Sequence, residues 1–125
     1  MPARPRQSKK PKRPARRGSR SPARALVARL WHGVVPSERA DAYTAYLRRT
    51  GVKDCRGTPG NRGVQILRRT VAGTTHFLFI SFWESLEAIR GFAGADLEQA
   101  RYYPEDRTYL LELEPTVTHH EVVER

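Results

Sequence analysis

Two histidines, His32 and His76, are the side chains of this sequence best placed to transfer a proton. Imidazole has an unperturbed pKa close to neutral pH, so it can act as a general base or as a hydrogen-bond donor to a substrate anion. Leu30 shares a strand face with His32, and Leu78 and Ile80 share one with His76, so both imidazoles have apolar neighbours. The alternative is that both are strand-end histidines bonded to backbone or water.

Four tyrosines are candidates to line a small-molecule pocket: Tyr43, Tyr46, Tyr102 and Tyr103. The first two share the apolar stripe of an expected helix, where aromatic side chains can equally belong to the core. The other two come just before a proline in the second half of the chain and are candidates for the rim of a pocket.

Trp83 ends an apolar strand that begins near His76. It lies seven residues further along, ~23 Å away at about 3.3 Å per residue. It also has the opposite strand parity, so the two side chains point to opposite faces of a sheet. A single site that uses both residues conflicts with this geometry, and Trp83 is a candidate for a pocket wall, for the core or for a subunit interface.

The stretch 74–87, TTHFLFISFWESLE, is the element on which these positions depend. Its apolar run from Phe77 to Trp83 is interrupted only by Ser81, which is typical of a strand buried on both faces. Ser85 is placed to cap a following helix with its hydroxyl. A strand buried on both faces needs one cover from its own chain and a second cover from elsewhere.

Further strands and helices are expected before and after this strand in the sequence. We expect a helix that Ser37 caps at its start and that ends near Gly51, followed by a polar loop at 52–62. A second helix is expected at 85–93, and strands are expected at 25–33, 63–71, 74–83 and 116–123. The order β-α-β-β-α-β is the ferredoxin-like α+β pattern, an antiparallel sheet with both helices on one face. The open apolar face predicts a homodimer in which two sheets pack together about a two-fold axis, as a dimeric α/β barrel.

Positive charge is concentrated at the start of the chain. Ten of the 23 Lys and Arg residues lie in residues 1–24, which contain no Asp or Glu, so residues 25–125 carry 13 basic and 13 acidic residues. We expect residues 1–24 to be a disordered tail, either a non-specific tether to polyanions or a solvated extension. The domain is expected at residues 25–125 and has no net charge of its own.

Motifs for metals and nucleotides are not found in the sequence. His119 and His120 are consecutive on an expected strand and so point to opposite faces, and there is no Cys-x-x-Cys, His-Glu-x-x-His or glycine-rich phosphate motif. Cys55 is a lone cysteine, expected in the polar loop, and no apolar run reaches the length of a membrane span. We therefore expect a soluble, cytoplasmic protein that uses no metal and no cofactor.

Four segments together resemble the antibiotic biosynthesis monooxygenase family of small dimeric α/β-barrel proteins: ARLWHGVVPSERADAYTAYL, PGNRG, FISFWES and ARYYPED. The resemblance covers residues 26 to about 123. It implies a pocket between helices and sheet in which Trp, Asn, Arg and Tyr side chains hold a phenol or quinol. Trp83 matches this pattern by motif, and Asn61 matches it by residue type.

The resemblance implies a cofactor-independent monooxygenase that acts on an aromatic or quinol-type metabolite. Such a site must favour the substrate anion, exclude water and hold the substrate while it gives an electron to O₂. The family also contains haem-degrading oxygenases, but the positions of their catalytic Trp and haem-ligating His hold Phe92 and Tyr102 here. The alternative function is a non-catalytic dimeric module, for binding a small ligand or for structure, with a basic N-terminal tether.

Overall fold

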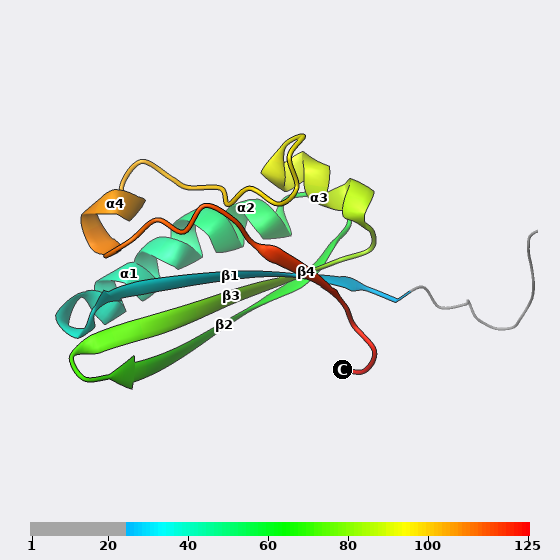
Figure 1. Cartoon of the computed structure of the whole chain (residues 1–125). Helices are drawn as coiled ribbons and strands as arrows, with labels where there is room; N and C mark the ends of the chain where they lie inside the picture. Colours follow the sequence, from blue (N-terminus) through cyan, green and yellow to red (C-terminus); the bar gives the residue numbers. More distant parts are fainter. Residues whose placement is uncertain (1–24) are drawn as a thin grey trace, which may run out of the picture.

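A computed structural model of the chain describes residues 25–125 (Figure 1). The predicted tail, and with it the proposed polyanion tether, lies outside the described residues. The strands form one antiparallel sheet in the order β2-β3-β1-β4, from β1 (Val27–Pro36), β2 (Asn61–Val71), β3 (Thr74–Trp83) and β4 (Thr118–Glu121). This order confirms the ferredoxin-like α+β fold. No helix in the described part of the chain is long and apolar enough to cross a membrane.

The first helical segment is longer than the sequence predicts. It consists of a 3₁₀ turn η1 (Ser37–Arg39), α1 (Ala40–Leu47), a π-helical segment η2 (Arg48–Val52) and α2 (Lys53–Arg56). The expected end at Gly51 is wrong, because this glycine lies inside η2 and is buried where an added Cβ would come within 3.2 Å of the Phe79 ring. Its role is close packing rather than helix termination.

Two further expectations for this segment are wrong. Ser37 does not cap the helix; its hydroxyl accepts a hydrogen bond from Thr75 instead. Cys55 lies in α2 rather than in a polar loop, and it is buried in the core, where loss of hydration raises the pKa of its thiol to about 12.

The helix after the central strand follows the prediction. Helix α3 (Leu86–Ala93) is capped by Ser85, whose hydroxyl accepts a hydrogen bond from the backbone N–H of Ala88 at 3.1 Å. An irregular segment, residues 94–105, follows it and leads to the one-turn helix α4 (Asp106–Tyr109).

The strand boundaries differ from the prediction at three places. β1 continues to Pro36, opposite Thr74 of β3, so His32 lies in the middle of its strand rather than at the end. β2 begins earlier, at Asn61, with an irregularity between Asn61 and Val64. β4 is shorter than expected and pairs only with the first residues of β1.

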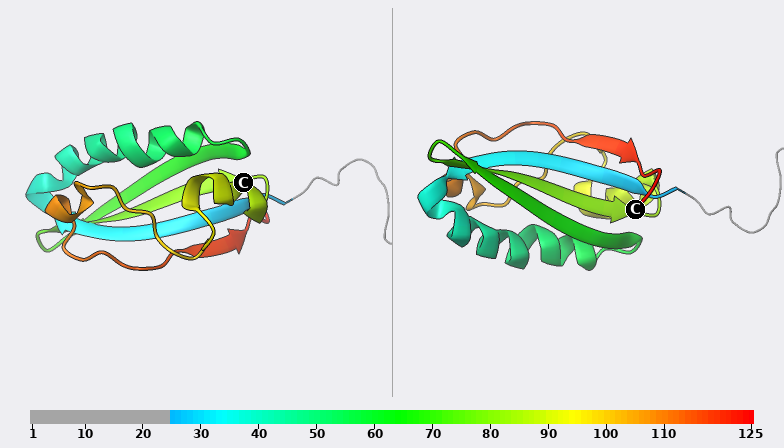
Figure 2. Two further views of the ribbon diagram at one scale, coloured as in Figure 1. Left: turned by 90° about the horizontal axis from the view of Figure 1, so that it is seen from above. Right: turned by 90° about the horizontal axis from the view of Figure 1, so that it is seen from below.

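All helices lie on one face of the sheet (Figure 1). Seen from above, the α1–α2 segment and the chain that follows α3 run over this face, and the opposite face has no helix (Figure 2). Phe77, Phe79 and Trp83 of β3 point toward the helices and are buried, while His76 and Leu78 point to the open face.

The open face is partly covered at one end by the chain terminus. After β4 the chain crosses beneath the sheet, and the guanidinium carbon of Arg125 lies 5.0 Å from the centroid of the Phe82 ring (Figure 1). Leu67 of β2, on the same face, remains 49% exposed. Strand β3 is therefore covered on one face by the helices of its own chain. Much of its other face has no covering element within the described residues (Figure 2).

Candidate functional site

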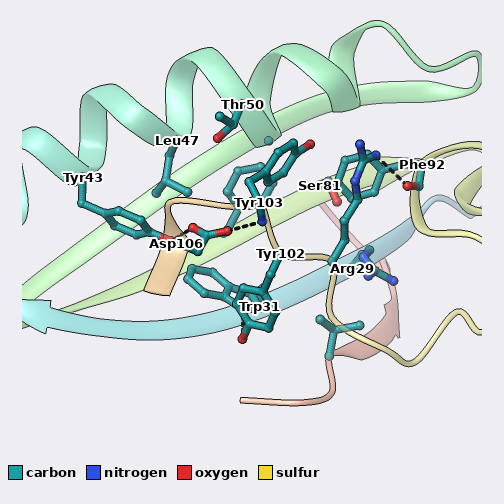
Figure 3. A pocket seen from close by; sticks show the side chains of 14 residues that line it. Arg29, Trp31, Tyr43, Leu47, Thr50, Ser81, Phe92, Tyr102, Tyr103 and Asp106 are labelled. Carbon is teal, nitrogen blue, oxygen red and sulfur yellow. Dashed lines mark hydrogen bonds between the residues drawn. The ribbon is translucent and has the colours of Figure 1, made fainter. Parts of the chain in front are cut away.

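A narrow pocket lies between η2, the sheet and the irregular segment 94–105 (Figure 3). Its free space is about 50 Å³. Six of the fourteen lining residues are aromatic and come from β1, α1, β3, α3 and the irregular segment: Trp31, Tyr43, Phe79, Phe92, Tyr102 and Tyr103. This is the position between helices and sheet that the family resemblance implies for a substrate.

A buried carboxylate, Asp106, lies in the wall of this pocket. The hydroxyl of Tyr43 donates a hydrogen bond to Asp106 Oδ1 at 2.8 Å, and the backbone N–H of Tyr103 donates to Oδ2 at 2.6 Å (Figure 3). The side chain is only 4% exposed, and burial raises the pKa of Asp106 against the opposing effect of these two hydrogen bonds. Each carboxylate oxygen keeps a lone pair, so Asp106 can accept a proton from a phenol in the pocket.

Tyr43 is held as a neutral hydrogen-bond donor. Burial and the neighbouring Asp106 carboxylate both raise the pKa of its phenol well above the usual value. The Tyr43 ring also packs edge-on against Phe77, with ring centroids 5.3 Å apart. The sequence gives no local signal for Asp106, which follows the tyrosines at the start of a short helix, so sequence reasoning missed the main acidic group of the pocket.

Two arginines complete the pocket wall. Arg29 is only 4% exposed and donates to the backbone oxygens of Leu97 and Gln99. Arg101 donates to the backbone oxygen of Phe92 at 2.8 Å and forms an ion pair with Asp54 at 3.3 Å. The charge of Arg101 is therefore balanced locally by a carboxylate.

The rim of the pocket is fixed by a short hydrogen-bond chain. The indole N–H of Trp31 donates to the hydroxyl of Tyr102 at 3.0 Å, and that hydroxyl donates to the backbone oxygen of Glu114 at 2.6 Å. Nearby, the hydroxyl of Tyr103 donates to Asp54 at 2.6 Å. Burial raises the pKa of both phenols, so both remain protonated at neutral pH.

The two predicted catalytic histidines contact each other on the opposite face of the sheet. His32 Nε2 and His76 Nδ1 lie 3.0 Å apart, and His32 Nδ1 lies 2.6 Å from the Glu114 carboxylate. His32 and His76 belong to the even-numbered positions of β1 and β3, whereas the pocket residues of these strands are odd-numbered. A ligand in the aromatic pocket therefore lies across the sheet from both imidazoles, and their catalytic role stays a prediction.

The structure brings three of the other predicted residues to the pocket and separates three from it. Tyr43, Tyr102 and Tyr103 line the wall. Tyr46 lies outside it and accepts a hydrogen bond from the backbone N–H of Glu105 at 3.1 Å. Trp83 and Asn61 do not line the wall either.

Trp83 and Asn61 have local structural contacts. Trp83 is fully buried in the core, and its indole N–H donates to the hydroxyl of Ser81 at 2.8 Å. Asn61 lies beside the irregularity at the start of β2, where its side-chain oxygen accepts a hydrogen bond from the N–H of Gly63 at 3.0 Å. Their proposed roles in substrate binding stay predictions.

The chain belongs to the antibiotic biosynthesis monooxygenase family, whose model matches residues 26–100. Two solved structures that carry this family name are similar in fold. The one from Bacillus cereus has 14% identity and a TM-score of 0.58, over 81% of this chain and 96% of that one. The one from Nitrosomonas europaea has 13% identity and a TM-score of 0.56, over 80% and 91%.

A haem-degrading protein from Mycobacterium tuberculosis, solved with two haems in its active site, is similar in fold as well. It has 21% identity and a TM-score of 0.52, over 79% of this chain and 97% of that one. At such identities these likenesses concern the fold alone. The comparison with curated proteins finds no significant match.

The pocket residues of this chain do not fit haem. Tyr102, which the family resemblance puts at the position of the haem ligand, uses its hydroxyl proton in the hydrogen bond to the backbone oxygen of Glu114. Burial raises the pKa of this phenol and so disfavours the tyrosinate that would bind iron.

Proposed function

We propose that this chain is a cofactor-independent monooxygenase-like protein that oxidises a small aromatic or quinol-type molecule in the helix–sheet pocket. The observation that carries the proposal is the buried Asp106 carboxylate, hydrogen-bonded by Tyr43 inside an aromatic wall. Membership of the monooxygenase family supports the reaction class.

In this proposal Asp106 removes the phenolic proton, and the resulting anion reduces O₂. Overall, O₂ converts a ring CH₂ of the keto tautomer into C=O, and the two hydrogens leave with the second oxygen atom as water. The raised pKa of Asp106 suits this role, because a base works best when its pKa approaches the operating pH. Tyr43 holds the carboxylate in position, and the aromatic wall excludes water around the developing anion.

Substrate entry requires one wall of the pocket to move. A cavity of about 150 Å³ is enough for benzene, whereas the free space here is about 50 Å³. We infer that residues 101–103 are the part of the wall that moves, since Arg101, Tyr102 and Tyr103 are held by side-chain hydrogen bonds. Residues 98–100 are fixed more firmly, by backbone hydrogen bonds and a β-bridge to residues 115–117.

We also propose that the open face of the sheet is covered by a second copy of the chain. Leu30, Leu67, Leu78 and Ile80 lie on this face without helices above them. An apolar sheet face of this kind favours a two-fold dimer. Such a dimer would enclose both His32 and His76 between the two sheets, together with a substrate. Catalysis of the same reaction by these two histidines is therefore the rival proposal.

The test is O₂ uptake by the purified chain with a panel of phenols and quinols, in the presence of a metal chelator. We expect turnover by the wild type and a loss of about 10²–10⁴-fold in Asp106→Asn, the usual contribution of a general base. Asp41→Asn, a change at an exposed carboxylate that pairs with Arg68, is the matched control and should keep full activity. Wild-type levels of uptake in Asp106→Asn would contradict the proposed base.

The small free space of the pocket favours a second candidate, a non-catalytic dimeric module. In this candidate the basic residues 1–24 tether the dimer to a polyanion. The chain should then retain heparin at low salt, and the truncated chain 25–125 should lose this retention while remaining dimeric. Equal retention of both forms would contradict the tether, and turnover in the O₂ assay would contradict the non-catalytic reading.

A further inference from the structure

We propose that the pocket takes an aromatic carboxylate, and that Arg29 selects the negative charge of this ligand. The inference names the substrate class of the pocket and rests on the proposed function only for treating this pocket as the ligand site. The fold buries the Arg29 guanidinium without an ion-pair partner among residues 25–125.

Arg29 lies on β1 with its side chain directed into the pocket wall (Figure 3). Its guanidinium donates to Leu97 O at 2.5 Å and Gln99 O at 3.0 Å, and one donor lies 3.2 Å from His119 Nε2. All three acceptors are neutral groups when His119 is unprotonated. Among residues 25–125, no carboxylate lies within ion-pair distance of Arg29.

A buried cation with only neutral partners is unusual, since charged side chains are rarely buried unless they are paired. Burial also lowers the pKa of Arg29, which reflects the cost of removing its charge from water. A bound anion would offset this cost. The other pocket cation, Arg101, already has Asp54 as its partner, so the uncompensated positive charge of the wall belongs to Arg29.

The unused donors of Arg29 match a carboxylate. A guanidinium has five N–H groups, and the contacts above involve two on Nη1 and one on Nη2. The Nε–H and the second Nη2–H have no partner among the described residues. Donors on two adjacent guanidinium nitrogens form the planar fork that binds both oxygens of one carboxylate.

The aromatic side chains around Arg29 favour a ligand that carries an aromatic ring beside its acid group. The guanidinium carbon of Arg29 lies 5.9 Å from the centroid of the Phe92 ring, and Phe79 and Trp31 line the same pocket. Asp106 lies on the other side of the pocket, beside Tyr43 (Figure 3). Its negative charge repels a carboxylate, so the ligand should bind with its acid group toward Arg29 and its ring toward the tyrosines.

Arg29 also has a purely structural alternative, since it ties the backbone of residues 97–99 to β1. A structural role affects the binding of every ligand equally. A charge-selecting role affects anionic ligands only. The two are separated by comparing ligands of equal size that differ in charge.

The experiment is calorimetric or NMR titration of the full-length protein with benzoate and with benzamide, which have nearly the same shape. We expect the wild type to bind benzoate at least about tenfold more tightly, as befits a charge-assisted hydrogen-bonded pair. Arg29→Gln should abolish this preference, with benzamide affinity unchanged, and Arg29→Lys should keep part of it. Arg90→Gln, a change at an exposed arginine paired with Glu87, should keep all of it.

Each outcome decides one question. Equal wild-type affinities for benzoate and benzamide would overturn the charge selection, although the pocket would remain a ligand site. A preference that persists in Arg29→Gln would overturn the role of Arg29. If neither compound binds, the inference fails together with the pocket. A clear preference for benzoate without O₂ turnover would leave this inference standing and count against the oxygenase.

Discussion

At the level of single residues, the pocket depends on contacts between side chains far apart in the sequence. Tyr43 and Asp106 are separated by 63 positions, and Arg29 and Gln99 by 70. Helical spacing predicts Tyr43 as a residue that faces the sheet, but no local pattern predicts its carboxylate partner. Asp106 and Arg29 could not be identified from the sequence, because their significance comes from burial and from which groups surround them.

Removing the Asp106 carboxylate should destabilise the fold. In Asp106→Ala the Tyr43 hydroxyl and the Tyr103 N–H lose their acceptor in a buried setting, which typically costs about 1–3 kcal/mol for such a group. Asp106→Asn can still accept one bond and should lose less. Urea unfolding of the three proteins measures the difference, and an Asp106→Ala midpoint equal to the wild-type midpoint would contradict the role of these bonds.

His119 should make the protein less stable as the pH falls. Burial, with a smaller effect from Arg29, lowers its pKa in the folded state. Below the unfolded-state pKa of about 6.5 the unfolded chain binds the proton more readily, so unfolding is favoured as the pH drops. His119→Gln retains an acceptor for Arg29 but cannot titrate.

The measurement is the free energy of unfolding of wild type and His119→Gln at pH 7.5 and at pH 5.5. We expect the wild type to lose more stability than the variant over this interval. An equal loss in both proteins would show that His119 does not contribute to the pH dependence.

At the level of elements, Gly33 of β1 is required by the packing of Trp31. A Cβ at position 33 would overlap the Trp31 indole ring, which lines the pocket and bonds to Tyr102. Gly33→Ala should displace the indole, cost about 1–3 kcal/mol of stability and alter the tryptophan fluorescence. Gly57→Ala is the matched control, since an added Cβ there meets only ordinary contacts. Unchanged fluorescence and stability in Gly33→Ala would contradict this packing.

Most of the element order could be predicted from the sequence, because strand and helix periodicity are local signals. The alternating and apolar runs predicted all four strands, and Ser85 predicted the start of α3. The predicted helix end at Gly51 was wrong because a glycine can either end a helix or allow another group to pack closely against the backbone. Only the position of the Phe79 ring shows that close packing applies here. The far end of β1 was missed because its pairing with β3 is a non-local contact.

At the level of the whole molecule, Glu114 connects the two faces of the sheet. Its backbone oxygen accepts a hydrogen bond from Tyr102 at the pocket rim, while its carboxylate contacts His32 on the open face. The pocket and the proposed dimer interface therefore share a residue at the edge of β1.

A charge on the open face should prevent dimer formation. Leu78 lies on β3 opposite His32 and Leu67, in the middle of this face, so Leu78→Glu would bury a carboxylate between the two sheets. We expect a dimer for the wild type and a monomer for Leu78→Glu by light scattering. Leu86→Glu, at an exposed position of α3, should remain dimeric. A monomeric wild type, or a dimeric Leu78→Glu, would contradict the proposed interface.

The most direct test of the pocket as the functional site is the rate of O₂ uptake in Asp106→Asn compared with His76→Gln, with the same phenol or quinol substrate. Asp106 lies in the pocket, and His76 lies on the opposite face of the sheet. The pocket account predicts a loss of about 10²-fold or more in Asp106→Asn and a near wild-type rate in His76→Gln. The reverse pattern would contradict it and place the reaction on the open face.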